Sequence, residues 1–244
     1  GTLRITTFDA PFAKVRNCTF ENCGAPVAGA VYASASVDLL EFYDCAFSGN
    51  DSPESHGGAI RVRYASSVKI SKCMFLDNSS VKDGGAVFAW VEDLFRIENC
   101  LFAGNRANLD ESLWDGGGAL GARLGSDVAG ELLIAHSTFT NNESLKNGGA
   151  LGAATAHDDV PSTLRILNSI VHGNSAPMYP ELHVDGDEIT VEVEYSNIKD
   201  DDDVIDTAVG NINDDSRFVD PDDGDFRLLG DSPCGDTGRA GEGH

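Results

Sequence analysis

A short phrase recurs along most of this chain and restricts its fold more than any other feature: a Cys or Ser followed two residues later by Phe or another apolar residue. It occurs at intervals of 27, 28, 27, 37, 32 and 27 residues, beginning at Cys18 and ending at Ser196. A second phrase, Gly-Gly-Ala followed by Ile, Val or Leu, appears once in each of four periods. Two phrases that keep the same order at this spacing indicate a stack of structural repeats.

Apolar residues alternate with polar ones just before each Cys or Ser, as at Val68 and Ile70, and this period of two predicts a strand. The alternation slips at the Cys or Ser, which marks a bend into a second short strand. The Gly-Gly-Ala phrase begins a third. A unit of about 27 residues cannot close a core alone, but stacked units can. We predict an all-β fold, a single-stranded right-handed parallel β-helix (solenoid) of about seven coils with three short strands per coil.

The same pattern predicts one domain over residues 1–244. Residues 1–14 are expected to form an incomplete first coil or cap, residues 15–199 the repeat coils, and residues 200–244 an acidic closing segment. Extra residues at 106–115, 124–131 and 154–161 are expected to protrude as loops from neighbouring coils. Inserted loops on one region of a solenoid are where such proteins usually carry function.

Stacking places equivalent residues above one another, about 4.8 Å apart. We therefore predict an internal ring stack of Phe20, Phe47, Phe75, Phe102 and Phe139. We predict an amide ladder that bonds along the axis, made by Asn50, Asn78, Asn105, Asn142 and Asn174. A third ladder contains Cys18, Cys45, Cys73 and Cys100. Because disulfide Cβ atoms must approach to about 3.8 Å, these four thiols are expected to be free. Pairing of Cys23 and Cys234 stays open.

The charge restricts the partners. The chain has 17 Lys and Arg against 40 Asp and Glu, a formal net charge of −23, which repels phosphate backbones, so no nucleic acid is expected as a partner. No run approaches the roughly 18 apolar residues of a membrane helix, so no membrane insertion of this segment is expected. No signal segment opens the chain, and we expect it to be a mature form or part of a longer chain.

The repeated Phe-x-x-Asn followed by Gly-Gly-Ala-Ile, Leu or Val resembles the repeats of chlamydial polymorphic outer-membrane proteins and related bacterial right-handed β-helix surface proteins. Residues 211–238 resemble the closing segment of secreted bacterial β-helix proteins, with Cys234 where that group usually has Ala. The resemblance implies an extracellular or cell-surface location. It leaves the activity open, since the group includes adhesins, autotransporter passengers and carbohydrate-active enzymes.

Acidic residues are concentrated near the C-terminus, with 11 Asp between residues 200 and 225. Loops rich in carboxylate oxygens suit Ca²⁺, a hard cation, and the candidate ligands are Asp220, Asp222, Asp223 and Asp225. The alternative is a set of solvated acidic turns, and the position of Gly224 does not fit an EF-hand loop. Ca²⁺ is thus a possible cofactor, and none is required.

The strand that follows each Gly-Gly-Ala phrase supplies the candidate ligand-binding surface. Its outward positions include aromatic and Arg side chains, with Asp83 just before a Gly pair and Trp114 in an inserted loop. Trp90 is expected to stack between two Arg side chains in a cation–π arrangement. The full candidate set is Arg61, Arg63, Asp83, Phe88, Trp90, Trp114 and Arg123.

Aromatic rings beside Arg suit sugars and uronates. Three interpretations stay open: side chains that only satisfy one another, a glycan-binding groove, or a catalytic cleft in which Asp83 and Asp115 form a carboxylate pair. No catalytic residue is assigned, because the standard metal and nucleophile motifs are absent. The favoured function is a secreted or cell-surface rod for adhesion or glycan binding, with a glycan or a host or neighbour cell-surface molecule as partner. The alternative is a polysaccharide lyase or glycoside hydrolase with its site on the outer strand face.

Overall fold

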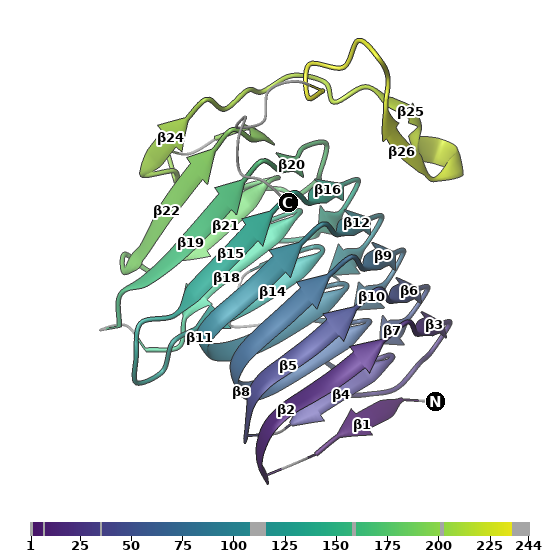
Figure 1. Cartoon of the computed structure of the whole chain (residues 1–244). Helices are drawn as coiled ribbons and strands as arrows, with labels where there is room; N and C mark the ends of the chain where they lie inside the picture. The colour runs from purple at the N-terminus through teal and green to yellow at the C-terminus, as the bar shows by residue number, and fades with distance from the viewer. Residues whose placement is uncertain are drawn as a thin grey trace.

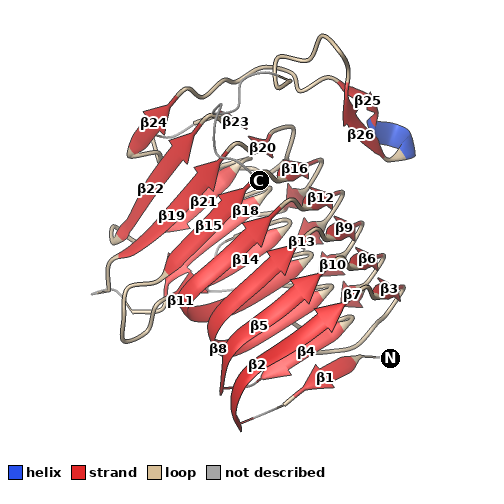
Figure 2. Ribbon diagram, in the orientation of Figure 1, coloured by secondary structure: helices blue, strands red, loops and turns tan. Residues whose placement is uncertain are grey.

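The chain winds into a stack of coils whose strands pair in parallel with the equivalent strands of the next coil (Figures 1 and 2). A computed structural model describes residues 2–6, 8–34, 36–107, 116–157, 160–200 and 203–235. The architecture is the all-β parallel solenoid that the repeats predict. Three ladders of strands form its faces, called here the first, second and third face in the order in which the chain follows them.

The first face contains the strands that follow each Gly-Gly-Ala phrase: β1 (Leu3–Ile5), β4 (Val31–Ser34), the first part of β8 (Ile60–Ser71), the first part of β11 (Val87–Glu98), β14 (Leu120–Leu124), β18 (Leu151–Thr155) and β21 (Leu182–Asp185). The second face, nearer the viewer in Figure 1, contains β2 (Phe8–Arg16), β5 (Ser36–Tyr43), the remainder of β8 and β11, β15 (Glu131–Ala135), β19 (Ser162–Leu167), β22 (Ile189–Glu194) and β24 (Thr207–Val209). In β8 and β11 the chain turns from one face to the next within one continuous 12-residue strand.

The third face is a seven-stranded ladder of short strands: β3 (Thr19–Glu21), β6 (Ala46–Ser48), β9 (Met74–Leu76), β12 (Leu101–Ala103), β16 (Thr138–Thr140), β20 (Ile170–Val171) and β23 (Asn197–Ile198). The structure adds a short fourth strand in four coils: β7 (Asp51–Ser52), β10 (Ser79–Ser80), β13 (Arg106–Ala107) and β17 (Glu143–Ser144). These two-residue strands follow the Asn ladder and lead the chain back toward the first face.

The ring stack of the third face is confirmed. Its centroids are 4.8 Å apart between Phe47 and Phe75, 4.5 Å between Phe75 and Phe102, and 4.4 Å between Phe102 and Phe139, with nearly parallel planes. Phe20, the first ring of the predicted stack, lies 5.0 Å from Phe47. The four rings from Phe47 to Phe139 are fully buried, so the register of the third face is set by an uninterrupted aromatic column in the core.

The Asn ladder is confirmed atom by atom. In Asn78 the side-chain oxygen accepts hydrogen bonds from both the backbone N–H and the amide group of Asn50. Its own amide donates to Asn105 Oδ1 at 2.9 Å and to the Phe47 carbonyl at 3.0 Å. The same pattern continues through Asn142 to Asn174. Each of the amides from Asn50 to Asn142 therefore bonds the next Asn of the ladder and a strand carbonyl of the preceding coil.

The four thiols of the Cys ladder are free, as predicted, and Cys23 and Cys234, whose pairing stayed open, are free as well. Cys45, Cys73 and Cys100 are buried, while Cys18 at the end of the column is half-buried. The Cys73 N–H donates to Cys100 Sγ at 3.4 Å, and the Cys100 N–H donates to Ser137 Oγ at 3.1 Å. A thiol and a hydroxyl therefore accept the equivalent backbone hydrogen bond in successive coils. Burial raises the pKa of Cys45 to about 11, and contact with Cys100 together with burial raises that of Cys73 further.

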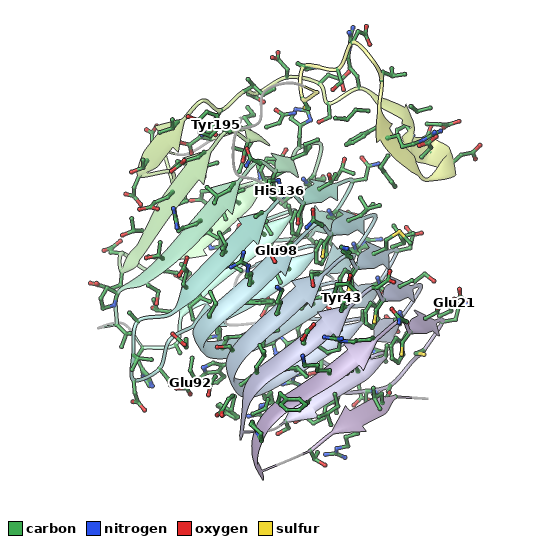
Figure 3. All side chains as sticks on the ribbon, viewed as in Figure 1. Glu21, Tyr43, Glu92, Glu98, His136 and Tyr195 are labelled. Atoms are coloured by element: carbon green, nitrogen blue, oxygen red, sulfur yellow. The ribbon has the colours of Figure 1, made fainter. Side chains whose placement is uncertain are left out.

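Each corner between the second and third faces is made by one residue with a left-handed backbone, directly before the Cys or Ser. The backbone angle φ is between 46° and 53° at all seven: Asn17, Asp44, Lys72, Asn99, His136, Asn168 and Tyr195. Figure 3 shows Tyr43, Glu98, His136 and Tyr195 following one another along this corner. The bend that the slipped alternation predicts is therefore a single αL residue per coil.

The last described residues lie across the C-terminal end of the stack (Figure 1). Beyond β24, a bridge between Asn197 and Ile212 continues the coil pattern past residue 199. A small hairpin follows, made by β25 (Phe218–Asp220), a 3₁₀ turn (Pro221–Asp223) and the antiparallel β26 (Asp225–Leu228). Asn197 joins the two parts, because its amide donates to the Asp214 carbonyl and to Cys234 Sγ.

Candidate functional site

The outward column on the first face has the register that the repeats predict. Tyr32 on β4 pairs with Arg61 on β8, Arg61 with Phe88 on β11, and Phe88 with Gly121 on β14. The structure adds Arg4 on β1, which pairs with Tyr32 and places its guanidinium 5.3 Å from that ring's centroid. The alternation of Leu3, Arg4 and Ile5 was the available sequence signal for this strand.

The next column differs from the prediction. Arg63 does not stack on Trp90. A bulge gives β8 two residues, Arg63 and Tyr64, opposite the single Trp90 of β11. The Tyr64 ring takes the stacking position, with its centroid 4.8 Å from that of Trp90. Arg63 lies instead over Tyr64, at 5.1 Å, and donates to its hydroxyl at 3.1 Å. Hydrogen bonding to Tyr64 raises the pKa of Arg63.

The other face of the Trp90 ring has the predicted partner. Arg123 pairs with Trp90 in the strand register, and its guanidinium carbon lies 5.8 Å from the ring centroid. Arg123 is buried, and burial lowers its pKa, while Asp83 and Asp185 act in the opposite direction. Arg63, Tyr64, Trp90 and Arg123 therefore form one continuous outward row, called here the aromatic row.

Asp83 is not on the open surface. Its side chain is 8% exposed, and its Oδ2 lies 3.2 Å from Nδ1 of His56, which packs against the Phe88 ring at 4.3 Å. Asp83 and Phe88 also line a small cavity of about 20 Å³, together with Arg123 and Asp185. A space of that size holds about one water molecule, so this cavity does not admit a sugar.

A larger cavity lies at the N-terminal end of the first face. Its volume is about 490 Å³, and its lining includes Arg4, Tyr32, Arg61 and Arg63. Burial lowers the pKa of Arg61, and the positive charge of Arg63 adds to this effect. Burial raises the pKa of Tyr32, but interactions with Ser34 and Arg63 outweigh it and leave that pKa below its usual value. Sequence reasoning identified Arg61 and Arg63 but missed Arg4 and Tyr32 as site residues.

Two predicted participants lie outside the described residues. Trp114 and Asp115 belong to residues 108–115, so the structure does not place them. The neighbouring Gly116 is described, and its N–H donates to Asp83 Oδ1 at 3.4 Å.

Two of the four Asp side chains proposed for Ca²⁺, Asp220 and Asp225, have local roles in the closing hairpin. Asp220 accepts a hydrogen bond from the Asp223 N–H and so caps the 3₁₀ turn. Asp225 pairs with Arg227 at 2.5 Å, which lowers the pKa of Asp225 to about 2. Within the described residues, no group of three or more His, Cys, Asp and Glu side chains is placed to hold a metal ion. Ca²⁺ binding stays a prediction. Calorimetric titration with CaCl₂ tests it. Binding heat in the parent chain that is lost in Asp220→Asn would support the prediction, and the absence of binding heat in the parent chain would exclude it.

In the described part of the chain, no helix has the length and apolar character needed to cross a membrane.

Comparison with known proteins gives one positive result. No curated protein and no solved structure matches the sequence significantly. Residues 3–198 match the family model described as the right handed beta helix region, which covers the coils from β1 to β23. Because this match spans most of the sequence, the chain belongs to the right-handed β-helix family.

Proposed function

We propose that this β-helix is a rigid rod on a secreted or cell-surface protein that binds glycans with its first face. The observation that carries the proposal is the aromatic row, in which the paired rings of Tyr64 and Trp90 lie between Arg63 and Arg123. Tyr64 is 43% exposed, so part of this row is open to solvent.

The chemistry of the row fits a sugar. A pyranose presents C–H groups on its faces and hydroxyl groups at its rim, so a flat aromatic ring can cover a face while neighbouring donors bond the rim. Arg also recognises the carboxylate of a uronate by two parallel hydrogen bonds. The strands that carry the row keep these groups in place, because β8 and β14 pair with β11 on its two sides, with one bulge in β8 at Tyr64.

The repeat sequence supports the location. Its resemblance to bacterial surface proteins of the polymorphic outer-membrane type favours a surface role. The net charge of −23 is compatible with a surface that is exposed to water. The partner in this proposal is a glycan or a glycan-bearing molecule on a host or neighbouring cell.

A second candidate is a carbohydrate-active enzyme, and the observation that favours it is the buried Asp83. This carboxyl group contacts His56, and a carboxylate beside an imidazole is suited to proton transfer, while Arg123 in the same small cavity could hold a negative charge. Binding remains the favoured proposal because the Asp83 side chain is only 8% exposed.

A glycan array followed by calorimetry on the best ligand tests binding. Trp90→Ala and Tyr64→Ala are each expected to weaken binding at least tenfold. Phe12→Ala is the matched control, because Phe12 is 61% exposed on β2 of the second face and should leave binding unchanged. Equal affinity in Trp90→Ala and the parent chain would overturn the proposal. Release of reducing ends or unsaturated products that disappears in Asp83→Asn would favour the enzyme.

A further inference from the structure

We infer that the 490 Å³ cavity at the N-terminal end of the first face binds an oxyanion, namely the carboxylate, sulfate or phosphate group of a small ligand. The inference deepens the proposed function by naming the charged group that would sit beside a sugar on the aromatic row. It depends on four side chains: Arg4, Tyr32, Arg61 and Arg63.

The residues that line this cavity carry positive charge, whereas the chain as a whole is strongly negative. Of the described residues that line it, three are Arg (Arg4, Arg61 and Arg63) and none is Asp or Glu. The whole chain has 40 acidic residues against 17 basic ones. Three guanidinium groups around one space without a carboxylate create a local positive potential in a molecule that is otherwise strongly negative.

Within the described part of the chain, these guanidinium groups have no carboxylate partner. Among the described residues, no ion pair involves Arg4, Arg61 or Arg63. Arg61 donates from Nη1 to Ser55 Oγ, but its Nε is buried and has no hydrogen-bond partner in the described part of the chain. An anion in the cavity would give the three guanidinium groups a partner of opposite charge.

The remaining contacts hold the Arg side chains in a defined arrangement. Arg4 and Arg61 lie on the strands on either side of Tyr32, and Arg4 stacks on the Tyr32 ring. Arg63 contacts Tyr64, which connects the cavity with the aromatic row. Guanidinium planes that are already ordered by stacking lose less freedom when they bind an oxyanion.

The size of the cavity fits more than an isolated ion. A volume of about 490 Å³ is within the range of about 300–1,000 Å³ that is usual for small-molecule sites. We therefore assign to it a sugar-sized ligand that carries an oxyanion, with the anion at Arg61 and the remainder of the ligand extending toward Tyr64.

Calorimetric titration of the whole chain with four probes tests the inference: methyl β-D-glucuronide, sodium sulfate, sodium phosphate and the neutral methyl β-D-glucoside. At least one anionic probe is expected to bind saturably, and the neutral probe at least tenfold more weakly. The anion that binds best identifies the oxyanion type.

Three variants locate the site. Arg61→Gln and Arg4→Gln are each expected to weaken binding of that anion at least fivefold. Arg4 is exposed, so its variant tests the site even if Arg61→Gln folds poorly. Arg165→Gln is the control, because it removes one positive charge on the second face, where Arg165 pairs with Glu192. No saturable anion binding, or equal loss in Arg4→Gln and Arg165→Gln, would overturn the inference. Such a result would leave the proposed glycan binding intact, because that proposal is tested separately by Trp90→Ala.

Discussion

The Tyr64 ring lies against the Trp90 ring, with 4.8 Å between centroids, in the position that equal repeat spacing assigns to Arg63. Thirteen residues separate Ile60 from Cys73, and thirteen separate Val87 from Cys100. The first irregularity in strand pairing is therefore compensated by a second, between Val91 and Leu94. The two strands differ in local register although their lengths agree.

Tyr64 provides a direct test of this bulge. Its φ of 62° is a left-handed conformation that costs an L-residue about 1–2 kcal/mol. Tyr64→Gly and Tyr64→Ala both remove the ring, but only glycine relieves the backbone cost. We expect Tyr64→Gly to be more stable than Tyr64→Ala by about 1 kcal/mol in urea unfolding. Equal stability of the two variants would contradict the left-handed backbone at this position.

The Asn ladder should be the most sensitive polar element of the core. Asn78→Ala removes the bonds that the Asn50 amide, the Asn105 oxygen and the Phe47 carbonyl make to Asn78, so we expect a loss of about 3 kcal/mol or more in unfolding free energy. Urea unfolding followed by circular dichroism measures the loss. Asn213→Ala is the control at an exposed Asn and should change stability by less than about 0.5 kcal/mol. If the loss of unfolding free energy in Asn78→Ala were as small as that in Asn213→Ala, the ladder would contribute little to stability.

The ring stack should respond to truncation at its centre. Phe75 lies between Phe47 and Phe102 and is fully buried, so Phe75→Ala creates a cavity and should cost about 3–5 kcal/mol. Phe12→Ala removes the same ring from a 61% exposed position, and its effect should be small. Thermal and urea unfolding of both variants compare the two positions. A cost below about 1 kcal/mol at Phe75 would contradict the packed column.

The thiols should differ in reactivity with their position. With a pKa of about 11, Cys45 is almost entirely protonated at pH 8, and buried Cys73 is protected further. We expect the half-buried Cys18, Cys23 and Cys234 to react first with a thiol reagent, and all six to react after denaturation. Fewer than six reactive thiols under denaturing, non-reducing conditions would indicate a disulfide.

The same pKa shift has a consequence for stability. Cys45 has a higher pKa in the folded chain than its ordinary value of 9.0, so the folded form retains the proton over a range where the unfolded form loses it. This contribution is fully present below pH 9 and is lost as the pH rises toward about 11. Cys45→Ser should flatten the fall in unfolding free energy over that range, and an unchanged pH profile would exclude the effect.

The ladders could be predicted from sequence because stacking repeats one environment in every coil. The same side chain is then favoured each time, as at Phe47, Phe75 and Phe102, and the period reveals the contact. The left-handed corner could not be recognised in this way. Asn17 and Asn99 are ordinary residues for such a conformation, but Lys72, His136 and Tyr195 adopt it because the coils above and below require it.

The candidate site was only partly predictable for a related reason. Outward residues follow the register without a common composition, so Arg61 and Phe88 could be placed in one column but the cavity beside them could not. The cavity depends on Arg4 and Tyr32, which belong to the first strands, where the repeat phrases are weakest. Asp83 was expected near the surface, but it is buried and contacts His56 from the preceding coil.

The Asn ladder also gives the stack an electrical direction. Each amide directs its oxygen toward the preceding coil and its NH₂ group toward the following one, so the side-chain dipoles add from Asn50 to Asn174. The positive end of this row points toward the C-terminal coils, and there the Asn174 amide donates to a carboxylate oxygen of Glu181 at 2.6 Å. An anion at that end complements the summed dipoles, as an acidic side chain does at the start of an α-helix. The two ends of the solenoid are therefore electrostatically different, although its repeats are nearly the same.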